Sequence, residues 1–190
     1  MLPVDSAAVA TTGERMHDDG TALDHAVERL NALDPQEFHA VFAACLDIDR
    51  WVRALEAERP FASADALVSA ADRHAAAITP EEVGTAIARH PRIGEKAAGS
   101  DTESAWSRAE QAGVSLADAR TAASLSRGNT DYEERFGHIY LVCANGRSGD
   151  ELLADLNSRL SNDPAAETRV VAEEFRKIAL VRVRKLLLEP

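Results

Sequence analysis

The chain has 190 residues, of which 45% are apolar and only 5% aromatic, and its formal net charge is −11. This length fits one domain with a single core, and a composition dominated by Ala and Leu favours packed helices over a β-sandwich. Because the basic residues are scattered and the net charge is negative, we expect neither nucleic acid nor an anionic membrane as a partner.

The first twenty residues are predicted to form a disordered leader, followed by one helical domain over residues 21–190. The leader carries acidic residues and lacks the apolar core of a secretory signal. No run of 18 apolar residues follows it, so we expect no membrane span and a cytoplasmic location. Cys45 and Cys143 lie far apart without a CxxC pair, so no zinc site is expected. Two buried, reduced thiols are predicted, with a disulfide between them as the alternative.

Start and stop signals predict four helices in the first half of the chain. Asp34-Pro35-Gln36-Glu37 combines an N-cap, a proline at the first helical position and a capping-box glutamate. A second helix is expected to begin near Asp49, and Ser63 is expected to cap a third. Thr79-Pro80-Glu81-Glu82 repeats the capping box, and Pro91 should stop the fourth helix because the residue before a proline is pushed out of the α region.

The second half of the chain predicts four more helices around one extended segment. A helix from about 102 to 112 precedes a long one that Ser115 caps, which Gly128-Asn129 could break. The apolar run 138–143 is interpreted as extended, although periodicity alone does not separate it from a helical turn. Ser148 is expected to cap the next helix, and Asp163-Pro164 opens a last one to about residue 188. The predicted fold is an all-α, single-domain bundle of about eight or nine helices.

Arg182 interrupts an apolar row on this last helix. The row follows helical spacing and consists of Val171, Phe175, Ile178 and Leu186. A guanidinium in a core-facing row must meet a carboxylate, carbonyls or a ligand, because burying it unpaired is costly. An internal salt bridge or a side chain that reaches solvent is the structural alternative to an anion or carbonyl anchor in a cleft.

His90 and a polar helix face are the candidates for catalysis. His90 precedes a proline and a glycine-bearing loop, and its ordinary pKa suits proton transfer, although a single histidine is more often a surface or capping residue. Ser107, Glu110 and Gln111 share one helix face at spacings of three and four. That face is either solvated or, if it borders a cleft, suited to a small nitrogen-rich ligand.

Other polar features are interpreted as structural. Asn145–Ser148 is an ordinary capping turn or an anion site at a helix start. Glu133-Glu134 and Glu173-Glu174 are interpreted as solvated helix faces. The sequence has no GxGxxG, P-loop, HExxH or GxSxG pattern.

Ordered blocks of residues nevertheless resemble one enzyme family. His90-Pro91-Arg92-Ile93-Gly94 followed by Ser107-x-x-Glu110-Gln111-x-Gly113 is similar to the signature of the 2-oxo-4-hydroxy-4-carboxy-5-ureidoimidazoline (OHCU) decarboxylases. Further blocks in the family's order are Asn31 with Phe38, Arg59–Phe61, Asn129–Gly137, Cys143–Ser148, Arg159–Asn162 and Lys177–Arg182. The resemblance spans roughly residues 22–188.

The resemblance implies an enzyme that converts OHCU to (S)-allantoin in urate breakdown without a cofactor or metal. It implies His90 and Glu110 as catalytic residues. The implied substrate contacts are Pro91, Ser107, Gln111, Ile139, Leu141, Val142, Cys143 and Arg182. It further implies a small-molecule substrate and a homodimer as an expectation from the family.

This chain departs from the family at two places. The family usually has aromatic residues at the positions of His138 and Tyr140, which could alter pocket polarity, and Leu is common where Val183 stands. Two other interpretations remain open at this point. One is a non-enzymatic helical module that binds a partner, and the other is an enzyme of the same fold acting on another ureido or imidazole substrate.

Overall fold

The computed structural model describes residues 14–88, 90, 92–93, 106 and 119–188. The described residues form eight helices and no strand, which confirms the predicted all-α fold. The helices are α1 (Glu14–Ala32), α2 (Pro35–Cys45), α3 (Asp49–Ala57), α4 (Ala64–Ala75), α5 (Pro80–Ile87), α8 (Ala119–Phe136), α9 (Gly149–Arg159) and α10 (Pro164–Leu188). Among them, none has the length and apolarity that crossing a membrane would require.

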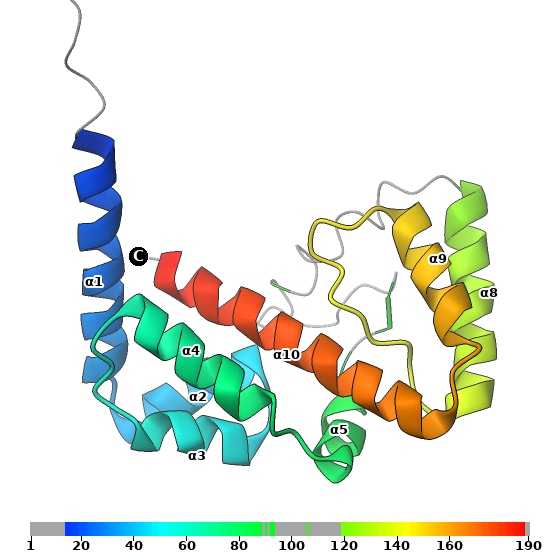
Figure 1. Cartoon of the computed structure of the whole chain (residues 1–190), viewed down its shortest axis with the longest axis horizontal. Coiled ribbons are helices and arrows are strands. Elements are labelled where there is room, and N and C mark those ends of the chain that lie inside the picture. The colour runs from blue at the N-terminus through cyan, green and yellow to red at the C-terminus, as the bar shows by residue number, and fades with distance from the viewer. Residues whose placement is uncertain (1–13, 89, 91, 94–105, 107–118, 189–190) are drawn as a thin grey trace, which may run out of the picture.

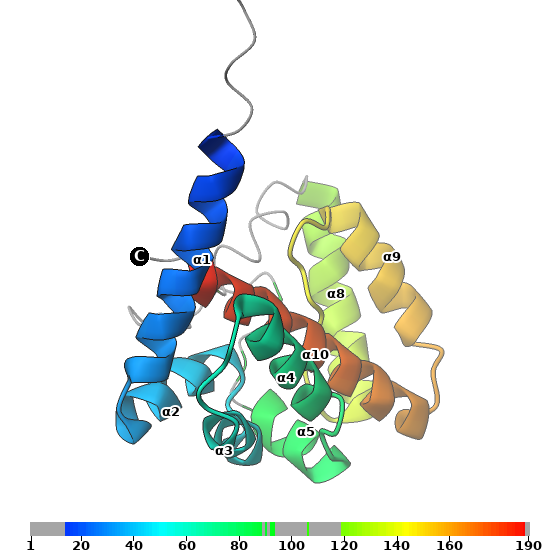
Figure 2. The ribbon, with the colours of Figure 1, turned by 60° about the vertical axis from the view of Figure 1, so that its left-hand side comes forward.

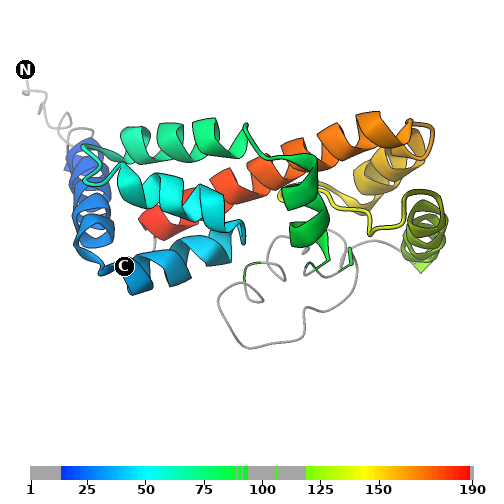
Figure 3. The same cartoon turned by 90° about the horizontal axis from the view of Figure 1, so that it is seen from below.

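Helix α10 is the axis of the molecule. It runs through the length of the fold, with α1 to α4 around its C-terminal half and α8 and α9 beside its N-terminal end (Figures 1 and 3). It contacts α1, α2, α4 and α5, while α8 packs mainly against α9. Turning the view by 60° shows the same separation between the α1–α5 group and the α8–α9 pair (Figure 2). Helix α10 therefore connects the α1–α5 group with the α8–α9 pair.

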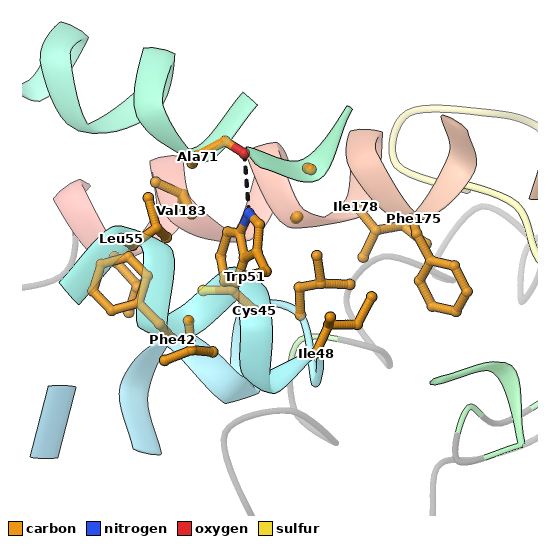
Figure 4. Close-up of a cluster of buried hydrophobic side chains, with 14 of the residues drawn as sticks. Phe42, Cys45, Ile48, Trp51, Leu55, Ala71, Phe175, Ile178 and Val183 are labelled. Atoms are coloured by element: carbon orange, nitrogen blue, oxygen red, sulfur yellow. Dashed lines mark hydrogen bonds between the residues drawn. The ribbon is translucent and has the colours of Figure 1, made fainter. Parts of the chain in front are cut away.

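Two hydrophobic clusters fill the fold. The larger one joins α1 to α5 with α10, and the smaller one joins α8, α9 and the chain between them. In the larger cluster the fully buried Trp51 donates its indole N–H to the carbonyl oxygen of Ala71 at 3.0 Å, so its one polar atom is satisfied (Figure 4). Phe42, Leu55 and Val183 surround the same region.

The predicted starts of α2 to α5, α9 and α10 are confirmed, whereas the cap predicted at Ser115 lies outside the described residues. The side chains of Asp34, Thr79 and Ser148 each accept the backbone N–H of the third helical residue, a glutamate, and each cap residue donates its own backbone N–H to that glutamate's carboxylate. The hydroxyl oxygen of Ser63 accepts a backbone N–H at the start of α4. The same geometry identifies the turn before α9 as a capping turn. The helix predicted at 102–112 lies outside the described residues.

Helix α1 was not among the helices that the sequence predicted. It starts at Glu14, within the segment predicted as a disordered leader, although residues 1–13 lie outside the description. Ala26, Val27 and Leu30 are buried at helical spacing, and α1 contacts α4 and α10. These buried apolar residues lie in the C-terminal half of α1, and their packing stabilises the helix. The division of the chain at residue 20 stays a prediction.

Helix α8 passes through Gly128 without a break. A Cβ atom at Gly128 would lie only 2.6 Å from Cδ2 of the buried Leu156 on α9. The glycine therefore permits close packing of α8 on α9, and the predicted break is wrong because a helical glycine costs only about 1 kcal/mol relative to alanine.

We expect Gly128→Ala to lower the free energy of unfolding by about 1 kcal/mol, because overpacking costs about 1–3 kcal/mol and outweighs the gain in helix propensity. Urea denaturation measures the change. Gly84→Ala in α5 is the matched control: its Cβ would meet no atom within 4 Å, so this variant should be as stable as the wild type or more so. Equal effects of the two substitutions would contradict the packing explanation.

Candidate active site

The structure describes part of the predicted site. Its described members are His90, Ile139, Leu141, Val142, Cys143 and Arg182. The members outside the described residues are Pro91, Ser107, Glu110 and Gln111. The geometry below therefore concerns α5, α10 and the chain between α8 and α9.

His90 follows α5 in a non-helical conformation, as predicted. Its backbone N–H donates to the carbonyl oxygen of Ile87 at 3.2 Å. Its half-buried ring meets the ring of Phe175 edge to face, with centroids 5.2 Å apart and planes at 66°. Phe175 belongs to α10 and is fully buried, so the imidazole is supported by the central helix.

A cavity of about 520 Å³ opens beside His90. Val83 and Ile87 of α5 form an apolar wall, and His138 and Ile139 close it from the chain after α8. This volume lies within the ~300–1,000 Å³ range of small-molecule sites. The combination of an apolar wall and two imidazoles suits a compact polar ligand.

Glu133 of α8 also borders this cavity, where it forms an ion pair. Its Oε2 accepts from Nη2 of Arg92 at 2.8 Å, and this contact lowers the pKa of the Glu133 carboxyl. Its side chain is 26% exposed. The interpretation of Glu133 as a freely solvated residue is wrong, because Arg92 reaches it from the loop after α5.

The chain Ile139–Cys143, here called the 139–143 segment, is neither helical nor paired in a sheet. Gly137 turns the chain out of α8 with φ +75°. The Leu141 carbonyl accepts from Nη1 of Arg159 at 2.9 Å, and the Cys143 N–H donates to Oε2 of Glu174 at 2.8 Å. Side chains of α9 and α10 thus hold the backbone of this segment from two directions.

His138 bonds its own neighbour at the start of the segment. Its Nδ1 lies 3.0 Å from the carbonyl oxygen of Ile139. A carbonyl only accepts, so Nδ1 carries a proton and donates it. The departure from the family at position 138 therefore adds a polar ring to the lining of the cavity. Tyr140, the other departure, points to α9 and donates to Asp155 at 2.5 Å.

Arg182 is buried, with 1% of its surface exposed, and its Nη1 donates to the carbonyl oxygen of Ala44 at 3.1 Å. A carbonyl was among the partners that the sequence predicted. Arg182 lies seven residues after Phe175 on the same buried row, a rise of about 10.5 Å. The guanidinium and the ring that supports His90 therefore share one face of α10.

The described cavity unites only some of the predicted residues. His90 and Ile139 line it, whereas Leu141, Val142, Cys143 and Arg182 are not among its described lining. The predicted substrate contacts of the four latter residues stay predictions.

Both cysteines are free thiols, as predicted. The described residues contain no group of three His, Cys, Asp or Glu side chains placed to hold a metal ion.

Sequence reasoning missed Glu174. It was interpreted as part of a solvated face, but its exposed fraction is 7%. The signal was present in the sequence: Glu174 lies three residues after Val171 and four before Ile178, which places it on the buried face.

The sequence profile of the OHCU decarboxylase family matches residues 31–184. The chain belongs to this family. OHCU decarboxylase from Amia calva is 30% identical over 164 residues, which are 85% of this chain and 94% of the relative. The uric acid degradation bifunctional protein TTL of Arabidopsis thaliana is 30% identical over 146 residues, 75% of this chain and 45% of that protein.

A solved structure of an OHCU decarboxylase, obtained in the presence of (S)-allantoin, has the same fold. It superposes with a TM-score of 0.65 over 78% of this chain and 97% of that one, at 23% identity. These matches confirm the predicted family and enzyme class. This OHCU decarboxylase family member is a carboxy-lyase.

Proposed function

We propose that this protein decarboxylates OHCU, formed from urate, and releases (S)-allantoin. The observation that carries the proposal is the cavity of about 520 Å³ beside His90, in a chain of this family. The Amia calva relative is an OHCU decarboxylase, and this supplies the proposed substrate. A partner-binding module would instead present an exposed apolar groove, and the half-buried imidazole beside this cavity favours an enzyme.

The substrate can supply its own electron sink. When the bond from C4 to the carboxylate breaks, its electron pair forms a C4=C5 double bond and the electrons of the ring C5=N bond move to nitrogen, which takes a proton. Carbon dioxide leaves. The 4-hydroxyl then loses its proton as C5 gains one, giving the C4 carbonyl and the single stereocentre of allantoin.

The protein's task is then to orient, polarise and protonate. His90 hydrogen-bonds the 4-hydroxyl and manages its proton, supported from behind by Phe175. Glu110 fixes the imidazole or the ureido N–H groups, while Ser107 and Gln111 read the ring and ureido amides. Arg182 holds a carbonyl or the developing negative charge. These roles are parts of the proposal.

The test uses freshly prepared OHCU. Because this compound also decays spontaneously, the enantiomeric excess of allantoin, followed by circular dichroism, is the cleanest measurement. We expect accelerated conversion to one enantiomer. Racemic allantoin formed at the uncatalysed rate would overturn the proposal, and selective turnover of another ureido or imidazole compound would redirect it. The predicted homodimer and cytoplasmic location stay predictions.

A further inference from the structure

We propose that Glu174 is a positioning residue of the substrate pocket: it sets the 139–143 segment at a fixed height over α10 by accepting the Cys143 N–H. The inference rests on the proposed function, because it assigns Glu174 a part in substrate binding. It does not make Glu174 a catalytic residue, since its contacts are with the protein.

The two carboxylate oxygens of Glu174 accept hydrogen bonds from different donors. Oε2 accepts the backbone N–H of Cys143 at 2.8 Å, and Oε1 accepts from Nζ of Lys177 at 2.7 Å. The bond from Lys177 balances the charge of the nearly buried carboxylate and raises the pKa of the ammonium group. A buried carboxylate is retained only with such partners, so each oxygen is accounted for.

Glu174 and its neighbour Phe175 control two walls of the site from one turn of α10. Phe175 supports the ring of His90, and Glu174 holds Cys143, the last residue of the segment that begins with the cavity-lining Ile139. The distance between the histidine and the segment is therefore set by one rigid element. Positioning of this kind matters because a misplacement of about 1 Å can cost about 100-fold in rate.

The contact also requires this side chain. Among the described residues the 139–143 segment has no strand partner, and side chains supply hydrogen bonds to two of its backbone groups. Arg159 serves the Leu141 carbonyl from α9. Glu174 accepts the Cys143 N–H from α10. Of α9 and α10, only α10 also carries Phe175, which contacts the ring of His90.

Three substitutions separate positioning from general stability. Glu174→Gln keeps an oxygen that can accept the Cys143 N–H. Glu174→Asp keeps the charge but is one methylene shorter and cannot reach the amide. Glu174→Ala removes the acceptor. Glu173→Ala is the matched control, since Glu173 is the preceding residue of α10 and pairs only with Arg176 at the surface among the contacts described here.

With OHCU as substrate, we expect the Asp and Ala variants to raise KM by about tenfold or more and to lower the enantiomeric excess of allantoin. The reason is that the segment shifts once its acceptor is lost, and a misplacement of about 1 Å can cost about 100-fold. Glu174→Gln should stay within about threefold of the wild type. The shape of the pH profile of kcat should not change, because His90 keeps its support from Phe175.

The outcomes distinguish the claims. If the wild type and the Glu173→Ala control give racemic product at the uncatalysed rate, the proposed function fails. If they are active, and the folded Asp and Ala variants keep the wild-type KM and enantiomeric excess, the positioning role fails. If both variants are unfolded, Glu174→Gln decides: wild-type KM and enantiomeric excess support the hydrogen bond as the active feature, and their loss overturns it.

Discussion

Replacement of His90 by alanine should lower kcat/KM for OHCU decarboxylation by at least about 100-fold, because general acid–base assistance contributes about 10²–10⁴-fold. The imidazole lies half-buried at a cavity of about 520 Å³ and stacks edge-on against Phe175, so its ring is held where a bound molecule can meet it. Initial rates and the enantiomeric excess of allantoin, measured on freshly prepared substrate, report the effect.

His25→Ala provides the control for the loss of an imidazole as such. His25 lies on α1 with a side chain 73% exposed, and its contact is with Glu28 at 3.6 Å. This variant should convert OHCU at the wild-type rate. A His90→Ala protein that folds normally and still produces a single enantiomer at near wild-type speed would remove His90 from the mechanism.

Much of the helical layout follows from local sequence signals. The capping boxes at Asp34 and Thr79 place two helix starts correctly because a cap satisfies backbone N–H groups within its own turn. The burial of Arg182 follows from its spacing against Phe175 and Ile178 on one helix. These features depend on residues at most a few turns apart, so the sequence alone determines them.

Features that depend on contacts between distant segments were not predictable in the same way. Gly128 was interpreted as a possible helix break, whereas the close approach of Leu156 leaves no room for a side chain there. Leu156 lies on another helix, so the local sequence does not indicate this contact. The spacing of Glu174 on α10 indicates its buried face, but not that the Cys143 N–H of the chain after α8 donates to its carboxylate there. The pairing of Glu133 with Arg92 joins residues 41 positions apart. Spacing predicts which face a residue occupies, but not what that face meets.

The candidate site shows the same division. The His90 motif and the family resemblance predicted His90 and Ile139 as site residues, and both line the cavity. Neither predicted that His138 would line the same cavity with its Nδ1 proton committed to a backbone carbonyl. That arrangement depends on the turn at Gly137, where the chain leaves α8.

Removal of the Glu167 carboxylate should be the most destabilising of the substitutions considered. Glu167 is completely buried at the start of α10 and accepts from Nη2 of Arg159 at 2.6 Å and from Nδ2 of Asn162 at 2.7 Å. The hydroxyl of Tyr132 donates to the same carboxylate, and burial, followed by this contact, raises the pKa of Tyr132. Glu167→Ala should lower the free energy of unfolding by about 3–5 kcal/mol, because it removes the nearer carboxylate of the buried guanidinium and leaves only Asp155, at 3.6 Å, as its acidic partner.

Urea denaturation measures this loss, with Arg53→Ala as a control for ion pairs in general. Arg53 pairs with Asp49 at 2.9 Å on the surface of α3, with a side chain 73% exposed, and its removal should cost less than about 1 kcal/mol. Combining Glu167→Ala with Arg159→Leu should cost less than the sum of the two single changes, because the double variant no longer buries a guanidinium that has lost its nearer carboxylate. Additive losses, or a Glu167→Ala protein within about 1 kcal/mol of the wild type, would show that the buried pair does not hold α9 to α10. In that case the packing of Leu152 and Leu156 in the smaller hydrophobic cluster would have to hold α9 in place. Arg159 could then still donate to the Leu141 carbonyl and support the 139–143 segment.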